Sequence, residues 1–230
     1  MLYGLIGVFL LFLIYGPQLW VRYVLSRHSK IIENIPGTGR ELAEHLLAQF
    51  QLSEVKVELT DKAGDHYSPV DNAVRLSPDV YGGKSLTAIA VAAHEVGHAI
   101  QFNRKEPVSF LRERYLAKAH FIQRAGVYLL MLLPAIGAIV RIPHIVLLTG
   151  GIGLATMLIS VLMYAAILPE EWDASFNKAL PILKEGHYVP EEHMPAIRQI
   201  LKACALTYVA AALADILSLW RWIALLRAAR

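Results

Sequence analysis

Four apolar blocks limit the folds open to this chain more than any other feature of its sequence. They occupy residues 2–20, 125–140, 145–168 and 203–220. A helix needs about 20 mainly apolar residues to cross the hydrocarbon core of a bilayer, and these blocks approach or exceed that length. Helices also satisfy their own backbone hydrogen bonds, as the bilayer core requires. The sequence therefore predicts a mainly α-helical integral membrane protein with about four transmembrane helices.

The charges beside the first block predict how the chain is oriented. Arg22, Arg27 and Lys30 follow this block, whereas nothing basic precedes it. Because Lys and Arg are retained on the cytoplasmic side, we expect the N-terminus outside and residue 25 onward in the cytoplasm. No small-residue cleavage site follows the block, which favours an anchor over a removed signal peptide. The second and third blocks are joined by the short link 141–144, so they must form a hairpin that returns the chain to the cytoplasm.

The blocks divide the chain into five regions. In order they are the N-terminal anchor 1–24, a soluble segment 25–121, the transmembrane hairpin 122–168, a second soluble segment 169–202 and a C-terminal transmembrane or membrane-associated helix 203–230. In the first soluble segment, the apolar residues of 40–52 share one helical face. Residues 55–59 and 74–76 alternate as short strands do. We therefore expect a helix and a small antiparallel sheet, followed by a second helix.

That second helix is predicted from the stretch 90–101, which contains His94, Glu95 and His98 as an H-E-x-x-H motif. Ser85 is a suitable N-cap for it. Positions four apart share one face of a helix, so the two imidazoles can bind one metal ion. Zinc accepts imidazole and carboxylate ligands, and a glutamate beside the first histidine can take a proton from an attacking water. The motif therefore predicts one Zn²⁺ ion and a hydrolytic enzyme with Glu95 as general base.

Gly97 lies inside the same predicted helix. A glycine there costs about 1 kcal/mol relative to alanine. Such a residue is favoured where another backbone or a bound ion comes close to the helix. We therefore expect a tight contact at Gly97, between the two histidines.

A catalytic zinc usually has three protein ligands, so the motif needs a partner from elsewhere in the chain. The longer H-E-x-x-H-x-x-G-x-x-H pattern is absent, because Gln101 and Arg104 occupy the places of its glycine and third histidine. The remaining candidates are Glu170, Glu171, Asp173, His187 and His193. The hairpin returns residue 169 to the side of the motif, which favours the three acids over the two histidines in the later Gly- and Pro-containing loop. The residues alone leave the choice among the acids open.

The charge and the cysteine content argue against nucleic acid binding and against a zinc site built from cysteines. The formal net charge is +3 and the basic residues are spread out, so nothing indicates nucleic acid binding. The single cysteine, Cys204, allows no intramolecular disulfide and no multi-cysteine zinc site, and we interpret it as a small buried hydrophobe. The main alternative to an enzyme is a non-catalytic membrane scaffold or chaperone-like protein that retains a zinc site. Glu95 argues against this alternative, because a purely structural site does not use a general base.

Two motifs together carry a resemblance to a known family. The segments HEVGHAIQ and LPEEWDAS resemble those of the YugP-like family of neutral zinc metallopeptidases in bacterial membranes. More distantly, the chain is similar to the HtpX and CAAX prenyl protease I membrane peptidases, and the resemblance covers nearly the whole chain. It implies a zincin-like core of the gluzincin type and a zinc-dependent endopeptidase that acts on peptide or protein substrates. It also implies a location in the bacterial inner membrane, where the charges described above place the active site on the cytoplasmic side.

The resemblance also implies roles for individual residues. His94, His98 and Glu171 would bind the metal, and Glu95 would be the general base. The distant relatives have an Asp four residues after the ligand Glu, where this chain has Ser175. The group that orients a ligand histidine is therefore open, and Asp173 is a candidate. Tyr208, near the start of the last apolar block, is a candidate hydrogen-bond donor to the oxyanion, although an aromatic residue at the membrane interface is the simpler interpretation.

Overall fold

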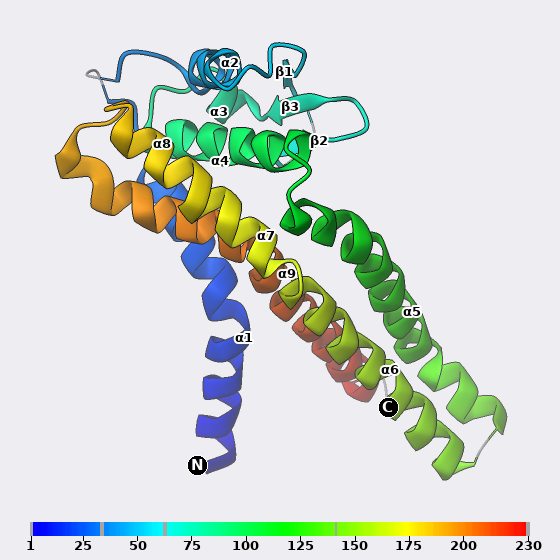
Figure 1. Cartoon of the computed structure of the whole chain (residues 1–230). Coiled ribbons are helices and arrows are strands. Elements are labelled where there is room, and N and C mark those ends of the chain that lie inside the picture. The colour runs from blue at the N-terminus through cyan, green and yellow to red at the C-terminus, as the bar shows by residue number, and fades with distance from the viewer. Residues whose placement is uncertain (1, 33–34, 62–63, 141, 229–230) are drawn as a thin grey trace. The chain divides into compact units, whose positions relative to one another are not determined.

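The computed structural model describes the backbone of residues 2–32, 35–61, 64–140 and 142–228, and most of their side chains up to residue 213. The helices are α1 (Leu2–Arg27), α2 (Gly39–Gln49), α3 (Pro78–Tyr81), α4 (Leu86–Asn103), α5 (Leu111–Val140), α6 (Pro143–Ala165), α7 (Leu168–Trp172), α8 (Leu180–Glu185) and α9 (Met194–Ala228) (Figure 1). The strands are β1 (Lys56–Leu59), β2 (His66–Ser68) and β3 (Ala73–Leu76). Short 3₁₀ turns occur at η1 (Pro107–Phe110) and η3 (Glu191–His193), and η2 (Asp173–Ala179) is a π-helical segment.

The chain forms two compact units, each built from segments that are distant in sequence. Unit 1 consists of residues 1–18, 111–168 and 208–230. Unit 2 consists of residues 19–110 and 169–207. The long helices α1 and α9 contribute to both units, while the predicted zinc motif and the acidic segment both belong to unit 2.

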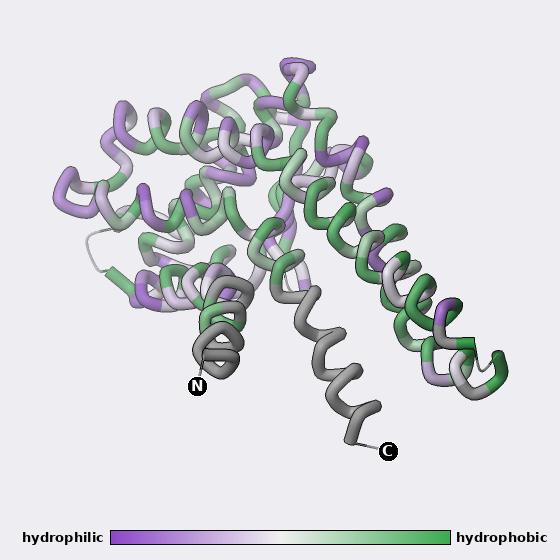
Figure 2. The backbone as a smooth tube through the Cα atoms, turned by 90° about the horizontal axis from the view of Figure 1, so that it is seen from below, coloured by the Kyte–Doolittle hydropathy of each residue, from purple (hydrophilic) through white to green (hydrophobic). Residues whose placement is uncertain are grey.

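Unit 1 contains the hairpin of α5 and α6, whose close packing depends on small residues. A Cβ on Gly126 would lie 2.6 Å from Oγ1 of Thr156, and a Cβ on Gly153 would lie 2.6 Å from Cγ of Leu130. In Figure 2 the tube of this hairpin is mainly green, the colour of apolar residues. Many large apolar side chains on the two helices are exposed, among them Phe121, Ile139, Leu147, Leu148 and Leu162. Such a surface is unfavourable in water and suits a lipid environment.

Three helical stretches of the described residues are long and apolar enough to cross a membrane. They run over Pro107–Gly137, His144–Glu185 and Glu191–Leu213. The first predicted span, residues 2–20, lies in helix α1, but many of its side chains fall outside the described ones. The last predicted span, residues 203–220, lies in helix α9, and its side chains after residue 213 are also outside the described ones. That these two spans cross the membrane over their predicted ranges therefore stays a prediction.

Unit 2 contains a three-stranded sheet in the order β1–β3–β2. Strand β2 pairs antiparallel with β3, with Tyr67 opposite Val74. Strand β1 pairs parallel with β3, with Val57 opposite Val74. The prediction of an antiparallel sheet is therefore wrong for β1 and β3. The cause is β2, a three-residue strand absent from the prediction: β1 and β3 both run opposite to it, so they run parallel to each other.

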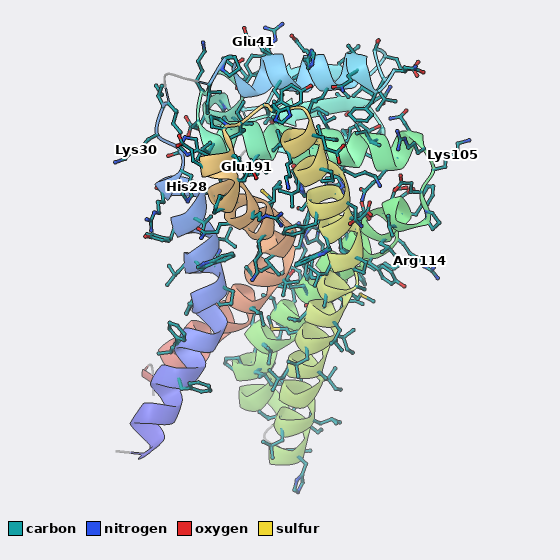
Figure 3. All side chains as sticks on the ribbon, turned by 60° about the vertical axis from the view of Figure 1, so that its left-hand side comes forward. His28, Lys30, Glu41, Lys105, Arg114 and Glu191 are labelled. Atoms are coloured by element: carbon teal, nitrogen blue, oxygen red, sulfur yellow. The ribbon has the colours of Figure 1, made fainter. Side chains whose placement is uncertain are left out.

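Helix α4 forms the core of unit 2. All of its residues from Leu86 to Gln101 are buried, and Ser85 caps it, because its Oγ accepts the N–H of Ala88 at 3.1 Å. Helix α2 packs on α4 through the buried side chains of Leu42, Leu46 and Leu47, and its first turn is closed by a Thr38–Glu41 capping box. Charged side chains of this unit, such as Lys30, Glu41 and Lys105, project away from the ribbon (Figure 3). The predicted motif thus lies on a helix held on several sides by its own unit.

Candidate metal centre

The two histidines of the motif lie on one face of α4, as their spacing predicts. His94 and His98 are both buried, and their Nε2 atoms are 3.3 Å apart. Their rings meet edge to face, with centroids 4.7 Å apart. Because α4 is packed from Ser85 onward, both side chains are ordered by the core of unit 2.

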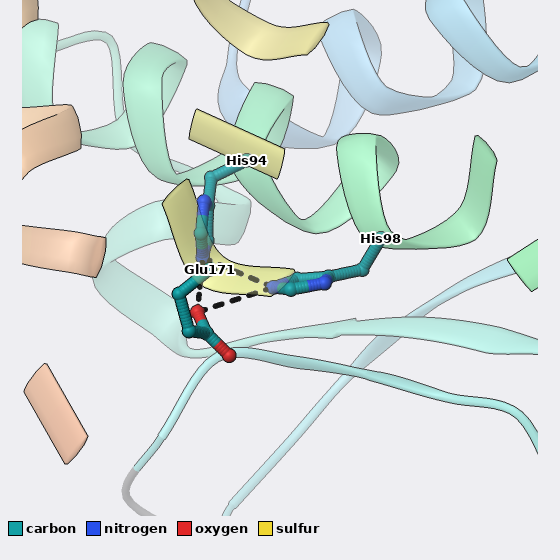
Figure 4. Close-up of side chains that lie close together, drawn as sticks. All are labelled: His94, His98 and Glu171. Carbon is teal, nitrogen blue, oxygen red and sulfur yellow. Dashed lines mark hydrogen bonds and ion pairs between the residues drawn. The ribbon is translucent and has the colours of Figure 1, made fainter. Parts of the chain in front are cut away.

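The third side chain of the cluster comes from α7. This short helix begins at Leu168, with Pro169 in its first turn, where a proline costs no hydrogen bond. The Oε2 atom of Glu171 lies 3.2 Å from Nε2 of His94 and 3.3 Å from Nε2 of His98 (Figure 4). One ligand atom from each of these buried residues lies within 4.8 Å of the others, and no second such group occurs among the residues searched. The structure thus brings together the three side chains that the resemblance implied as ligands.

The far edge of each imidazole meets a partner that orients it. Nδ1 of His94 lies 3.0 Å from Oγ of Ser175, whose hydroxyl donates to the carbonyl oxygen of Leu201 at 3.1 Å. Since that hydroxyl has only one proton, Oγ must accept from Nδ1–H of His94. Nδ1 of His98 lies 3.0 Å from Oε1 of Gln101, which can only accept. In a neutral ring this leaves Nε2 without a proton, and in both rings Nε2 is the atom that faces Glu171.

These contacts test whether the site fits a metal ion. With neutral imidazoles, two nitrogen lone pairs and a carboxylate oxygen converge within about 3.3 Å, an arrangement that only a positive charge stabilises. The other oxygen of Glu171, Oε1, is buried and has no hydrogen-bond partner among the described residues. Two imidazoles and one carboxylate are a donor set that zinc accepts. The residues therefore fit a bound zinc ion.

Gly97 explains how the two segments that carry the cluster come so close. A Cβ on Gly97 would lie 2.7 Å from the carbonyl oxygen of Ala174 in η2. The expected tight contact at Gly97 is therefore present, and the neighbouring backbone is that of the segment that follows Glu171. This approach brings a carboxylate from one helix within reach of two histidines on the other.

Glu95 is buried beside the histidines and is oriented by the sheet. The backbone N–H of Tyr67 in β2 donates to its Oε2 at 2.9 Å. A second carboxylate, Asp65, precedes the same strand and accepts the N–H of Ser77 at 2.7 Å. Burial raises the pKa of Asp65, and the negative charge of Glu95 adds to this increase, while the Ser77 hydrogen bond opposes it. The carboxyl group of Asp65 is therefore harder to ionise than that of a free aspartate.

The other candidate ligands lie elsewhere. Glu170 is buried, but its Oε1 is 3.9 Å from Nδ1 of His98, the ring edge that points away from the cluster. Asp173 accepts hydrogen bonds from Gln101 and Asn177 and pairs with Lys178, and none of its partners among the described residues is a histidine. His187 is exposed with a positive φ of 52°, and His193 lies 3.6 Å from Glu192. Neither of these histidines belongs to the cluster formed by the described residues.

Tyr208 belongs to unit 1 and not to the unit that holds the cluster. It packs there against a buried group that includes Ala119, Tyr164, Ile167 and Ala212. Its role as a donor to an oxyanion therefore stays a prediction. Cys204 is buried and free, in agreement with its interpretation as a small hydrophobe.

Sequence reasoning missed the roles of Gln101 and Ser175. The longer motif marks Gln101 only as the replacement of its glycine, although the position of Gln101 three residues after His98 places it on the same helix face. The family resemblance marks Ser175 only as a departure from the Asp of distant relatives. Its position four residues after Glu171 could have indicated that its side chain lies near the cluster.

Comparison with known proteins agrees with this chemistry. A family model described as "Putative neutral zinc metallopeptidase" matches residues 3–227. The chain is also 31% identical over 221 residues to a protein of Bacillus subtilis (strain 168) named "Putative membrane protease YugP", and the aligned region covers 94% of each chain. No solved structure matches the chain. The resemblance seen in the motifs is therefore confirmed, and the chain belongs to the family described as "Putative neutral zinc metallopeptidase".

Proposed function

We propose that this protein is a membrane-embedded zinc endopeptidase that hydrolyses peptide bonds in peptide or protein substrates. The observation that carries the proposal is the convergence of His94, His98 and Glu171. Glu95 follows His94 directly on the same helix, and the Tyr67 N–H orients its carboxylate. A structural zinc site usually closes all four positions with Cys and His, whereas a catalytic one combines three ligands with an open position. The three-residue cluster and the adjacent acid match the second pattern.

In this proposal the three clustered side chains hold one zinc ion through Nε2 of each histidine and the carboxylate of Glu171. Zinc, when bound, acts as a Lewis acid on the peptide carbonyl and makes water acidic enough to be deprotonated near neutral pH. Ser175 and Gln101 keep Nδ1 of the rings protonated and thereby present Nε2 to the metal. The buried setting strengthens these charge interactions, because little water competes with them.

Glu95 would move the proton. Its carboxylate accepts a proton from the attacking water, holds it, and delivers it to the amine that leaves when the peptide bond breaks. The Tyr67 N–H fixes Oε2, so Oε1 is the oxygen that we assign to the transfer.

The proposed location is the inner membrane of a bacterium, with the metal centre facing the cytoplasm. The exposed apolar side chains of the α5–α6 hairpin and the three candidate spans support membrane insertion. The basic residues Arg22, Arg27 and Lys30 after the first apolar block support the orientation.

Replacement of Glu95 by Gln tests the proposed reaction. We expect Glu95→Gln to keep its zinc and to lose hydrolysis of an unfolded protein such as casein by about 10²-fold or more, because an amide cannot accept the proton. Glu44→Gln, the same change at an exposed site on α2, is the matched control and should behave as the parent. Zinc content and cleavage are measured on the same purified samples. Parental turnover in zinc-loaded Glu95→Gln would refute the general base, and zinc binding without cleavage in the parent would favour the scaffold alternative.

A further inference from the structure

Gln101 is a polar side chain in the core of unit 2, and it touches both segments that supply the metal cluster. It is 0% exposed. Its Oε1 lies 3.0 Å from Nδ1 of His98 on its own helix. Its Nε2 donates to the carbonyl oxygen of Glu170 at 3.0 Å and to Oδ2 of Asp173 at 2.8 Å. A buried amide is costly unless it is satisfied, and here its partners come from both α4 and the α7–η2 segment.

The chemistry of these partners fixes the orientation of the amide. The carbonyl of Glu170 and the carboxylate of Asp173 can only accept hydrogen bonds, so they must face the NH₂ group of Gln101. The amide oxygen is then left for His98, whose Nδ1 must donate. A flipped amide would place its oxygen against two acceptors and is excluded by that repulsion.

Asp173 is itself held in place. Asn177 donates to its Oδ1 at 2.7 Å, and Nζ of Lys178 lies 3.2 Å from its Oδ2. Lys178 also pairs with Glu106, just beyond the end of α4, at 2.9 Å. The hydrogen bond from Gln101, together with those from Asn177 and Lys178, lowers the cost of keeping the Asp173 carboxylate ionised. The acceptor that orients Gln101 is therefore a fixed negative charge.

We propose that Gln101 is a positioning residue for the metal centre. It selects the His98 tautomer that presents Nε2, and it ties His98 to the backbone of the residue before Glu171. Nε2 of His98 and the carboxylate of Glu171, which come from two separate helices, are thereby held close together before a metal ion binds. The inference rests on the proposed zinc site, but it makes Gln101, rather than a carboxylate, the group that orients the second histidine.

The test is zinc affinity of the full-length protein in detergent, measured by competition with a chromophoric chelator. Gln101→Met keeps the length of the side chain and removes every hydrogen bond. We expect it to bind zinc about 10- to 100-fold more weakly, the usual effect of losing a partner of a metal-binding histidine. Gln199→Met, the same replacement at an exposed position of α9, should leave the affinity unchanged. The visible spectrum of the Co²⁺-loaded protein should change in Gln101→Met and not in Gln199→Met, because the spectrum reports ligand geometry.

Asp173→Ala separates positioning from a general loss of structure. If Asp173 acts through Gln101, the single variant Asp173→Ala binds zinc more weakly than the parent. The double variant should then bind zinc no more weakly than Gln101→Met alone. Additive losses in the two variants would overturn the proposal, as would parental affinity and an unchanged Co²⁺ spectrum in folded Gln101→Met. Should Gln101→Met fail to fold, Asp173→Ala alone decides, because Asp173 is partly exposed, whereas Gln101 is fully buried. Parental zinc affinity in that variant would also overturn the proposal.

Activity distinguishes this inference from the proposed function. A parent protein that binds zinc but cleaves nothing would refute the peptidase while leaving the effect of Gln101 on zinc affinity to stand. A parent that cleaves casein, with Gln101→Met equal to it in affinity and spectrum, would refute only the positioning role.

Discussion

Gly97 of α4 faces Ala174 of η2 so closely that a Cβ on Gly97 would lie 2.7 Å from the carbonyl oxygen of Ala174. Because the contacted atoms belong to the backbone, a Cβ at this position can be accommodated only if α4 or η2 moves. Gly97→Ala should therefore push apart the helix that carries the two histidines and the segment that carries Glu171. We expect it to weaken zinc binding at least about 10-fold and to lower the unfolding temperature. Overpacking costs about 1–3 kcal/mol, and a clash with backbone atoms belongs at the upper end of that range, above the gain of about 1 kcal/mol in helix propensity.

The control for Gly97→Ala is Gly151→Ala in α6. A Cβ at Gly151 meets nothing within 4 Å, so the same change there should leave zinc affinity at the parental value, and the better helix propensity of alanine should keep the unfolding temperature equal to that of the parent or raise it slightly. Unchanged zinc affinity in Gly97→Ala would show that the two segments do not need this close approach.

Asp65 predicts a pH dependence of stability. Burial raises the pKa of Asp65 above its value in the unfolded chain, which is about 4. As pH rises above that value, the unfolded chain loses the proton more readily than the folded protein does, so the free energy of unfolding decreases. Asp65→Asn keeps an oxygen that can accept the Ser77 N–H. We expect the metal-free variant to match the parent near pH 4 and to be increasingly more stable toward pH 7. Thermal unfolding in EDTA is the measurement, and Asp61→Asn, at an exposed side chain, is the control. A gap between Asp65→Asn and the parent that does not change with pH would contradict the assignment.

Helix α4 was largely predictable because its signals are local. Ser85 caps α4 as expected, and a glycine in a helix interior correctly indicated a close neighbour at Gly97. The sheet was less predictable. Strand β2 spans three residues, too few for alternation to be recognised, and the direction of β1 depends on how β2 and β3 pair. Strand pairing is a tertiary property, which a pattern along one segment does not contain.

The environment of the two imidazoles was only partly predictable. Ser175 and Asp173 lie in a π-helical segment, whose i→i+5 hydrogen bonds change the angular spacing of about 100° per residue found in an α-helix. A helical projection from Glu171 therefore does not show which of them meets a histidine. In the structure Ser175 meets His94, while Asp173 reaches His98 only through Gln101.

The predicted topology can be tested by cysteine labelling in intact bacterial cells. We expect Asp61→Cys to react with a membrane-impermeant maleimide only after lysis, because the residues after Arg22, Arg27 and Lys30 should be cytoplasmic. His144→Cys, at the exposed turn of the hairpin, should react from outside. The buried native Cys204 is replaced by Ala as background. Labelling of Asp61→Cys in intact cells, with none of His144→Cys, would reverse the orientation.

The most direct test of the metal centre compares two adjacent acids. Oε2 of Glu171 lies within 3.3 Å of Nε2 of both histidines, whereas Oε1 of Glu170 is 3.9 Å from Nδ1 of His98, on the opposite ring edge. A zinc ion held by two histidines alone is weakly bound, since catalytic sites use three protein ligands. The measurement is zinc per protein molecule after dialysis against a mild chelator. We predict that Glu171→Ala loses most of its zinc while Glu170→Ala retains it; equal occupancy in Glu171→Ala and the parent would contradict the proposed site.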